Sequence, residues 1–403
     1  MSLPKGWELK ELSELAEFKS GGTPSKSRTD YWGGETPWIT VKDLKMLHPN
    51  EFHQSLSEDG AAVARIMPAG TVYVVVRGMA LFKDLPVSIV DRPAAFNQDI
   101  KALTAADGID AEFLAYALVA HKSGILQLVD QAGHGTGRLD TTLLQAFPLP
   151  VPPLPEQRKI AEILRTWDEA IDLAERLVVE AELSHVARVS QLITKSGGDK
   201  HVVLDSLVRV VTTKNTVGNT NVLTSSARLG LVSQNEYFNK SVAGANLAGY
   251  LLLEHGDFAY NRSASKGNPF GVIRRLEKYP RGILSTLYLC FRIVDETRVS
   301  GDYLSHLLQS GVLDRQLSLI CQAGARSHGL LNVSKSDFLQ MVIPVPPIEA
   351  QDKIARLLDA GRREIMLLDK KVDALKEQKL GLMQQLLTGK IRVTVDEGEG
   401  ASA

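Results

Sequence analysis

The fold of this chain follows from the stretch PLPVPPLPEQRKIAEIL, residues 148–164. It returns as IPVPPIEAQDKIARLL, residues 343–358, and an offset of 194 residues gives nine identical positions in fifteen, without a gap. Each copy begins with prolines, which cannot continue a helix but suit the approach to one and its first turn, and then continues as a long helical pattern. A repeat this long indicates a duplicated domain with its connector, not the unit of a solenoid.

Apolar residues in both helical patterns recur in alternating steps of four and three, the spacing of a coiled-coil seam. Gly361 and Lys379 are defects in the second copy, and Leu183, Val186 and Ile193 indicate a shifted register late in the first. The alternative is an ordinary pair of core helices. The charge load off the seam favours two coiled-coil helices that pack against each other. The expected seam residues are Ile160, Leu164, Trp167, Ile171, Ile354, Leu358, Ile365, Leu368, Val372 and Leu375.

Composition limits the class of protein. The 403 residues suggest two to three domains, and a hydrophobic content of 44% is enough for their cores. No apolar run reaches membrane-spanning length and no signal peptide opens the chain, so we expect a cytoplasmic protein with no membrane partner. Cys290 and Cys321 are too few for a metal cage and predict buried, reduced thiols. Because the net charge is −1, any DNA contact must come from local clusters.

Two variable segments accompany the repeats, and they share a pattern. In the first, residues 71–76 predict a strand, 94–103 another strand, 112–119 a helix and 131–140 a glycine-rich loop. The second repeats this order: residues 255–262 match 69–77, 283–293 match 94–103, 302–309 match 112–119 and 322–332 match 131–140. Two similar scaffolds with different surface residues would bind two related but different targets.

We therefore expect an α+β fold with two similar domains, each a mixed sheet plus helices, and two long coiled-coil helices that pack against each other. The expected divisions are 1–147 for the first domain, 148–197 for the central proline entry and helix, 198–341 for the second domain, 342–392 for the C-terminal proline entry and helix, and 393–403 for a flexible tail.

These motifs carry a family resemblance over essentially the whole sequence. GWELKELSELAEFKSGGTPS at 6–25, the two proline-entry stretches and LKEQKLGLMQQLLTGKIRV at 375–393 resemble the DNA specificity subunit of type I restriction-modification systems. The resemblance implies that each variable segment is a target recognition domain reading one half of a bipartite sequence in double-stranded DNA. It also implies that the two helices form an antiparallel coiled coil that separates the domains, with a near two-fold axis relating the halves. The helices would set the spacer and dock two methyltransferase subunits, with restriction subunits as further partners.

By the same resemblance the chain is not an enzyme and binds no cofactor, and S-adenosylmethionine, ATP and magnesium belong to partner subunits. The residues agree with this: Asn268-Pro269-Phe270 lacks the second proline of an adenine methyltransferase motif, and Gly389-Lys390 lacks the rest of a phosphate loop. No metal-ligand spacing or nucleophile elbow is present. The alternatives are an enzyme with an unrecognised site, a structural coiled-coil scaffold, and a DNA-binding module outside restriction-modification.

Candidate DNA contacts are residues that can bond bases or phosphates and that lie in polar loops. The interval 261–281 holds six basic residues against one acid, Glu277. For any single residue the alternative is a solvated surface position. Trp32 and Trp38 could stack on bases, with packing as the alternative. The first-domain candidates are Ser20, Thr23, Ser25, Lys26, Arg28, Arg77, Lys83, His134, Thr136 and Arg138. The second-domain candidates are Lys214, Asn215, Arg228, Arg262, Lys266, Asn268, Arg274, Arg326, Ser327 and His328.

Partner subunits would meet the outer faces of the long helices. The candidate residues there are Arg165, Asp168, Glu169, Arg362 and Arg363.

Overall fold

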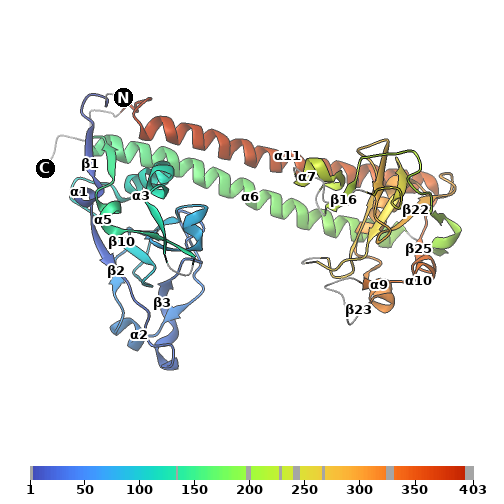
Figure 1. Cartoon of the computed structure of the whole chain (residues 1–403), viewed down its shortest axis with the longest axis horizontal. Helices are drawn as coiled ribbons and strands as arrows, with labels where there is room; N and C mark the ends of the chain where they lie inside the picture. Colours follow the sequence, from blue (N-terminus) through green and yellow to red (C-terminus); the bar gives the residue numbers. More distant parts are fainter. Residues whose placement is uncertain are drawn as a thin grey trace. The chain divides into compact units, whose positions relative to one another are not determined.

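The computed structural model describes residues 3–132, 135–196, 201–226, 229–238, 246–265, 268–323 and 331–394. The chain divides into two compact units, Met1–Ala174 with Lys371–Ala403, and Glu175–Lys370. Two long helices, α6 (Leu154–Ser196) and α11 (Ile348–Leu387), run through both units (Figure 1). Each unit therefore contains one half of each helix together with a sheet-containing domain. Among the described residues, no helix is both long and apolar enough to cross a membrane.

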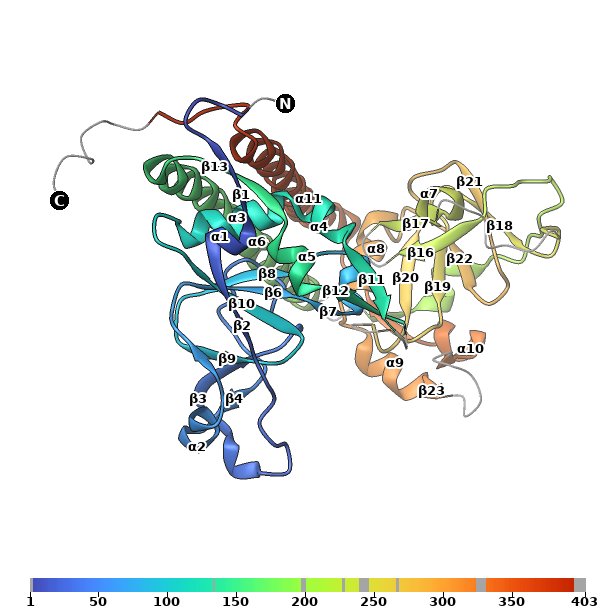
Figure 2. The ribbon, with the colours of Figure 1, turned by 60° about the vertical axis from the view of Figure 1, so that its left-hand side comes forward.

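An antiparallel four-stranded sheet forms the centre of the first unit, in the order β2-β10-β6-β8. Its strands are β2 (Ala16–Ser20), β6 (Thr71–Val75), β8 (Val87–Val90) and β10 (Ile100–Ala105). Strand β6 is the expected β-branched run and all five of its residues are buried; α3 (Ala111–Ala120) packs against one side of the sheet (Figure 2). The predicted helix at 112–119 is thus confirmed as α3.

Smaller sheets surround this centre. Residues 94–103, expected as one strand, are split between β9 (Ala94–Phe96) and β10, which belong to different sheets. The glycine-rich stretch 131–140, expected as a loop, contributes a hairpin of β11 (Val129–Ala132) and β12 (Thr136–Leu139), to which β7 (Arg77–Gly78) is added. The other elements of the first unit are β1 (Glu8–Glu11), α1 (Leu12–Leu15), η1 (Thr29–Tyr31), β3 (Trp32–Ile39), β4 (Ser55–Leu56), α2 (Glu58–Ala62), β5 (Ile66–Met67), η2 (Met79–Phe82), α4 (Lys122–Leu126), α5 (Thr141–Gln145) and β13 (Pro148–Val151).

The second unit has a sheet of the same form, in the order β15-β22-β19-β20, again antiparallel throughout. Its strands are β15 (Val208–Val210), β19 (Phe258–Asn261), β20 (Val272–Arg275) and β22 (Leu289–Ile293), with α8 (Gly301–Gln309) packed on β20. The other elements are β14 (His201–Val203), η3 (Leu204–Ser206), β16 (Leu223–Ser226), β17 (Gly230–Ser233), α7 (Gln234–Phe238), β18 (Leu251–Glu254), β21 (Arg281–Leu284), α9 (Asp314–Ile320), β23 (Gln322–Ala323), β24 (Leu331–Asn332), α10 (Lys335–Leu339) and β25 (Val342–Pro344).

The two sheets match strand for strand along the chain, so β2, β6, β8 and β10 correspond to β15, β19, β20 and β22. The proline entries match as well, because β13 pairs with β1 and β25 pairs with β14, both antiparallel. Residues 283–293, like 94–103, supply two separate strands, β21 and β22, because a turn interrupts them. The duplication expected from the sequence is therefore present in the topology.

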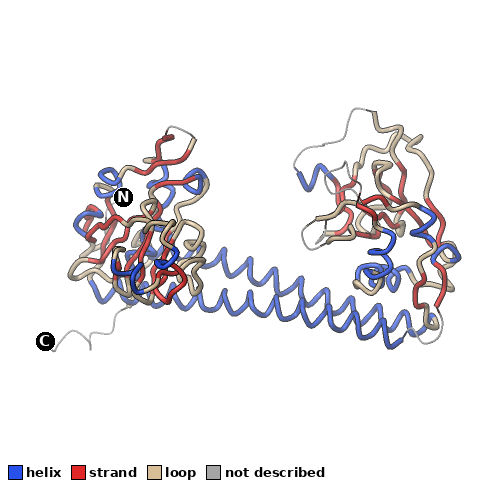
Figure 3. Tube along the Cα trace, turned by 90° about the horizontal axis from the view of Figure 1, so that it is seen from below, coloured by secondary structure: helices blue, strands red, loops and turns tan. Residues whose placement is uncertain are grey.

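Within the first unit, α6 and α11 pack along the expected seam (Figure 3). Ile160 and Leu164 share a core with Met383 and Leu386. Lys379, a defect in the apolar seam, is only partly exposed, and its Nζ lies 2.5 Å from Asp168 Oδ1. The Tyr116 hydroxyl on α3 donates to Asp168 Oδ2 at 2.7 Å. The polar seam position is thus satisfied by an ion pair that also holds the domain to the helices.

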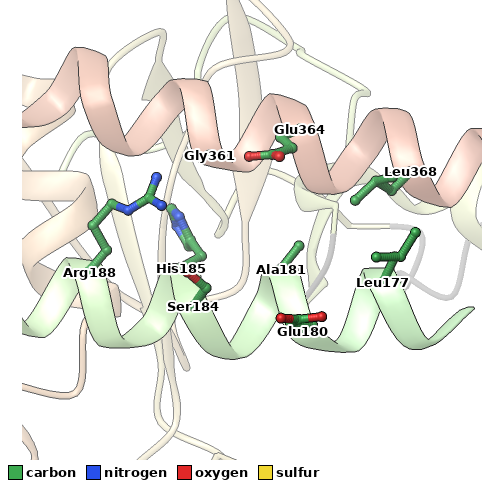
Figure 4. A pocket seen from close by; sticks show the side chains of 9 residues that line it. All are labelled: Leu177, Glu180, Ala181, Ser184, His185, Arg188, Gly361, Glu364 and Leu368. Carbon is green, nitrogen blue, oxygen red and sulfur yellow. The ribbon is translucent and has the colours of Figure 1, made fainter. Parts of the chain in front are cut away.

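Within the second unit the same helices run antiparallel, with Ile354 and Leu358 sharing a core with Val189 and Ile193. The other seam defect, Gly361, has a steric reason. A Cβ at this position would lie 2.7 Å from Nδ1 of His185, which points from α6 toward α11 (Figure 4). All ten expected seam residues are buried or half-buried. The register shift predicted for the last part of α6 is confirmed for Ile193, which is buried. It is wrong for Leu183 and Val186, which are exposed.

Both cysteines are free thiols. Cys290 is buried in β22 as expected, whereas Cys321 is only half-buried, because it lies beyond the end of α9 at the domain surface.

Candidate nucleic-acid interface

The loop at residues 20–28 of the first unit is braced by its own side chains. Thr23 Oγ1 donates to Gln98 Oε1 at 2.7 Å, and Ser25 Oγ lies 2.8 Å from Ser27 Oγ. Ser20 Oγ accepts from Lys101 Nζ at 2.5 Å. These hydroxyls are exposed and close to one another along the chain, but each already has an internal partner.

Two cations of this loop stack on aromatic rings. The Arg28 guanidinium lies 4.6 Å from the Tyr31 ring centre and bonds Asp30 at 2.6 Å, and this bond lowers the pKa of Asp30. Lys26 Nζ lies 5.8 Å from the Trp38 ring centre. Trp38 is buried and its Nε1 donates to the Gly22 carbonyl at 3.1 Å, so this tryptophan packs the loop. Trp32, half-buried, meets Trp38 edge to face at 5.0 Å.

A second group lies where β7 adds to the hairpin. Arg77 of β7 is directly opposite Arg138 of β12, and both side chains are exposed. On its other side Arg138 faces Asp130 of β11, and it lies 3.9 Å from Asp140. Lys83 follows η2, which packs on β12, while Thr136 is half-buried at the start of β12. The structure therefore brings Arg77 next to Arg138, and Lys83 follows the short helix that packs on the strand of Arg138. His134 lies outside the described residues.

Arg262 of the second unit is held by the protein backbone. Its Nη2 and Nε donate to the Leu287 carbonyl at 2.8 and 3.1 Å, and its Nη1 donates to the Val333 carbonyl at 3.0 Å. Gly70 and Gly256, both with positive φ, precede β6 and β19, and Arg262 lies six residues after Gly256 just as Val76 lies six after Gly70. Arg262 thus takes the place of a buried valine, not of Arg77, and strand alternation turns it inward.

Other second-domain candidates also have internal partners. Asn215 is buried and ties its loop together, accepting from the Asn219 N–H and donating to the Asn219 carbonyl, both at 2.8 Å. Lys214 Nζ donates to the Gly249 carbonyl at 3.0 Å. Burial and the nearby Arg362 lower the pKa of Arg274 to about 10.

Asn268 is half-buried and exchanges two backbone hydrogen bonds with Ser265. The remaining second-domain candidates lie outside the described residues; these are Arg228, Lys266, Arg326, Ser327 and His328.

Two exposed residues close to Arg77 and Lys83 in the sequence were not among the predicted contacts. Met79 and Phe82 of η2 are exposed apolar side chains between two basic residues. The signal was present, because the buried strand β6 is followed at once by Arg77, Met79, Phe82 and Lys83. The described residues contain no group of three or more His, Cys, Asp or Glu placed to hold a metal ion.

Comparison with known proteins finds relatives that share this pattern. Residues 4–183 match the family model of the type I restriction modification DNA specificity domain. The chain is 32% identical to the EcoR124I/EcoR124II specificity subunit of Escherichia coli over 180 residues, which are 44% of this chain and 45% of that protein. It is 22% identical to a putative MjaX specificity subunit of Methanocaldococcus jannaschii over 97% of this chain and 95% of that protein.

A solved structure, titled as the basis of complex assembly and conformational transition of the type I R-M system, has the same fold. It matches with a TM-score of 0.61 and 15% identity, over 97% of this chain and all of that one. In the E. coli relative the matched region spans less than half of the protein. Residues 4–183 thus resemble the type I restriction modification DNA specificity domain, and over nearly its whole length the chain is similar in sequence and fold to specificity subunits of such systems.

Proposed function

We propose that this chain reads a split DNA sequence for a type I restriction-modification enzyme, one half-site by each sheet-containing domain. The observation that carries the proposal is the duplication itself. The same four-stranded sheet occurs twice in the chain, while the loops that follow its strands differ in sequence and in side-chain arrangement. After the equivalent strands β6 and β19, for example, Arg77 is exposed in one domain, whereas Arg262 in the other donates to the Val333 carbonyl.

The helix pair would set the spacer between the half-sites and dock methyltransferase subunits. An apolar stripe supports docking on the second half of α6, where Val179, Leu183 and Val186 are exposed at spacings of four and three residues. Of the charged candidates on the helix faces, Arg165 and Glu169 are exposed and pair with each other at 3.1 Å. Arg363 is exposed, whereas Arg362 donates to Gln309 Oε1 at 2.9 Å and Asp168 bonds Tyr116.

The chain would act without chemistry of its own. Methyl transfer and any ATP-driven cleavage would belong to methyltransferase and restriction subunits, which would bring S-adenosylmethionine, ATP and magnesium. The proposed reaction places the complex in the cytoplasm, with the DNA it modifies.

Methylome sequencing of cells that express this chain with its cognate methyltransferase tests the proposal. We expect methylated adenines in a split motif, two defined half-sites around an unspecified spacer, which disappear when this chain is omitted. A continuous motif, or methylation that persists without this chain, would contradict the proposal.

A further inference from the structure

The segment 77–83 of the first unit presents apolar side chains in a basic surrounding. Met79 is 64% exposed and Phe82 is 48% exposed, and Arg77 and Lys83 bracket them in the sequence. Water-exposed methionine and phenylalanine side chains cost free energy unless a partner covers them. Gly78, with a φ of 142°, allows the chain to leave β7 and enter η2 so that both side chains point outward.

The protein holds this segment firmly. Leu81, between the two exposed residues, is buried in the core of the first unit. A Cβ on Gly137 of β12 would lie 3.0 Å from Leu81 Cβ, so hairpin and segment are in close contact. The backbone N–H groups of Arg77 and Lys83 donate to the carbonyls of Asp99 at 3.2 Å and Ala80 at 2.9 Å. The outward position of Met79 and Phe82 is therefore built into the fold and does not need a partner to form.

The charges of this surface favour an anionic partner. Arg77 and Arg138 are opposite each other on an antiparallel pair, where like charges destabilise the sheet. Among the described residues neither Arg77 nor Lys83 has a carboxylate within 4.0 Å, while nearby Asp84 is occupied by Lys122 at 2.7 Å. The negative charges of Asp130 and Asp140 lie next to Arg138 and not next to Arg77 or Lys83. A phosphate near Arg77 and Lys83 would offset the repulsion between Arg77 and Arg138. An acidic protein surface could also do this, but it would offer no apolar contact to Met79 and Phe82.

We propose that the segment 77–83 enters a groove of the DNA and is the contact element of the first domain. Met79 and Phe82 lie against base or sugar surfaces, and Arg77 and Lys83 hold the flanking phosphates. Apolar wedges of this kind widen or kink a groove at the base step they touch, whereas phosphate contacts fix register. The inference rests on the proposed function and assigns a location and a mode of contact to it.

The test uses the full chain in complex with its methyltransferase and a fluorescent duplex that carries the methylated motif. Binding is measured by anisotropy over a range of salt concentrations. We expect Met79→Ala with Phe82→Ala to weaken binding at least tenfold without changing the salt slope. We expect Arg77→Gln with Lys83→Gln to flatten the log–log salt slope by about one for each phosphate that the variant no longer binds. Matched controls are Met46→Ala, at a methionine 52% exposed, and Lys45→Gln with Arg65→Gln, at exposed cations elsewhere on the same domain.

Each outcome has one meaning. If both 77–83 double variants bind like their controls, the inference is overturned while the proposed function stands, because the parent complex still selects its motif. If the parent complex shows no preference for the motif over a scrambled duplex, the proposed function itself fails. If the apolar variant loses its methyltransferase in co-purification but keeps its fold by thermal unfolding, the surface binds protein and the inference is wrong.

Discussion

The side chain of Gln351 caps the start of the helix that begins after Ser300. Its Oε1 accepts from the Ser300 backbone N–H at 2.8 Å, and its Nε2 donates to the carbonyls of Arg298 at 3.0 Å and Pro346 at 2.8 Å. In the first unit Gln157 makes the same set of bonds, to the Asp110 N–H at 2.9 Å and to the carbonyls of Gly108 and Pro152 at 3.2 and 2.9 Å. The repeated glutamine thus joins each long helix to the domain helix beside it.

Gln351→Ala should destabilise the second unit by about 1–3 kcal/mol, because the fully buried Gln351 amide makes three hydrogen bonds and the buried Pro346 carbonyl loses its partner. Gln351→Glu should cost more at neutral pH, since a carboxylate cannot donate to the two carbonyls. Urea unfolding measures both, with exposed Gln378→Ala on α11 as the control for helix propensity. Equal midpoints for Gln351→Ala and Gln378→Ala would show that the cap contributes nothing.

Arg262→Ala should act first on stability. Its guanidinium links the Leu287 and Val333 carbonyls, and hydrogen bonds of a charged donor contribute about 1.5–3 kcal/mol. Arg262→Lys should recover only part of this, because an ammonium cannot reproduce the forked geometry. Thermal unfolding measures the loss, and methylome sequencing shows whether the second half-site also changes. A relaxed half-site with unchanged stability would mean that Arg262 reads DNA and that its internal bonds are dispensable.

Acid should weaken the second unit through His306. Burial and the nearby Arg362 lower the pKa of His306 to about 4, although its Nε2 lies 2.9 Å from Asp359 Oδ1. Because the unfolded chain takes up this proton near pH 6.5 and the folded chain does not until about 4, the stabilisation is complete above pH 6.5 and is lost as pH falls toward 4. His306→Gln should reduce the fall in unfolding free energy between pH 7 and 5. An identical pH profile in parent and variant would exclude His306 as the titrating group.

The helix pair should act as a ruler. Four residues inserted into both α6 after Ala174 and α11 after Lys370 add about 6 Å to each helix and nearly preserve the seam. At about 3.4 Å per base pair, the spacer in the methylated motif should lengthen by one or two pairs while both half-sites stay the same. Four residues inserted after Thr194 are the control, because Ile193 already lies in the second core and the seam ends there. An unchanged spacer in the double insertion would show that the helices do not set it.

The duplication and the helix pair could both be predicted from the sequence alone. Proline entries, the repeated glutamine and a four-three apolar period are local signals, and local backbone preference and burial suffice to interpret them. Even the defect at Lys379 could be located in this way, though not its partner Asp168. The same periods predicted β6 and α3, since a buried strand and a capped helix depend mainly on residues close in sequence.

Which polar residues remain available to a ligand depends instead on tertiary packing. Arg77 and Arg262 follow equivalent buried strands, yet one side chain is exposed and the other is bound by carbonyls from two distant loops. A shift of one residue along a strand reverses the face on which a side chain lies, and composition does not record that shift. Met79 and Phe82 would pass for core residues in the sequence, but close packing of Leu81 against Gly137 turns them outward. Exposure depends on what the rest of the chain places over a residue, and segments far away in the sequence supply that cover.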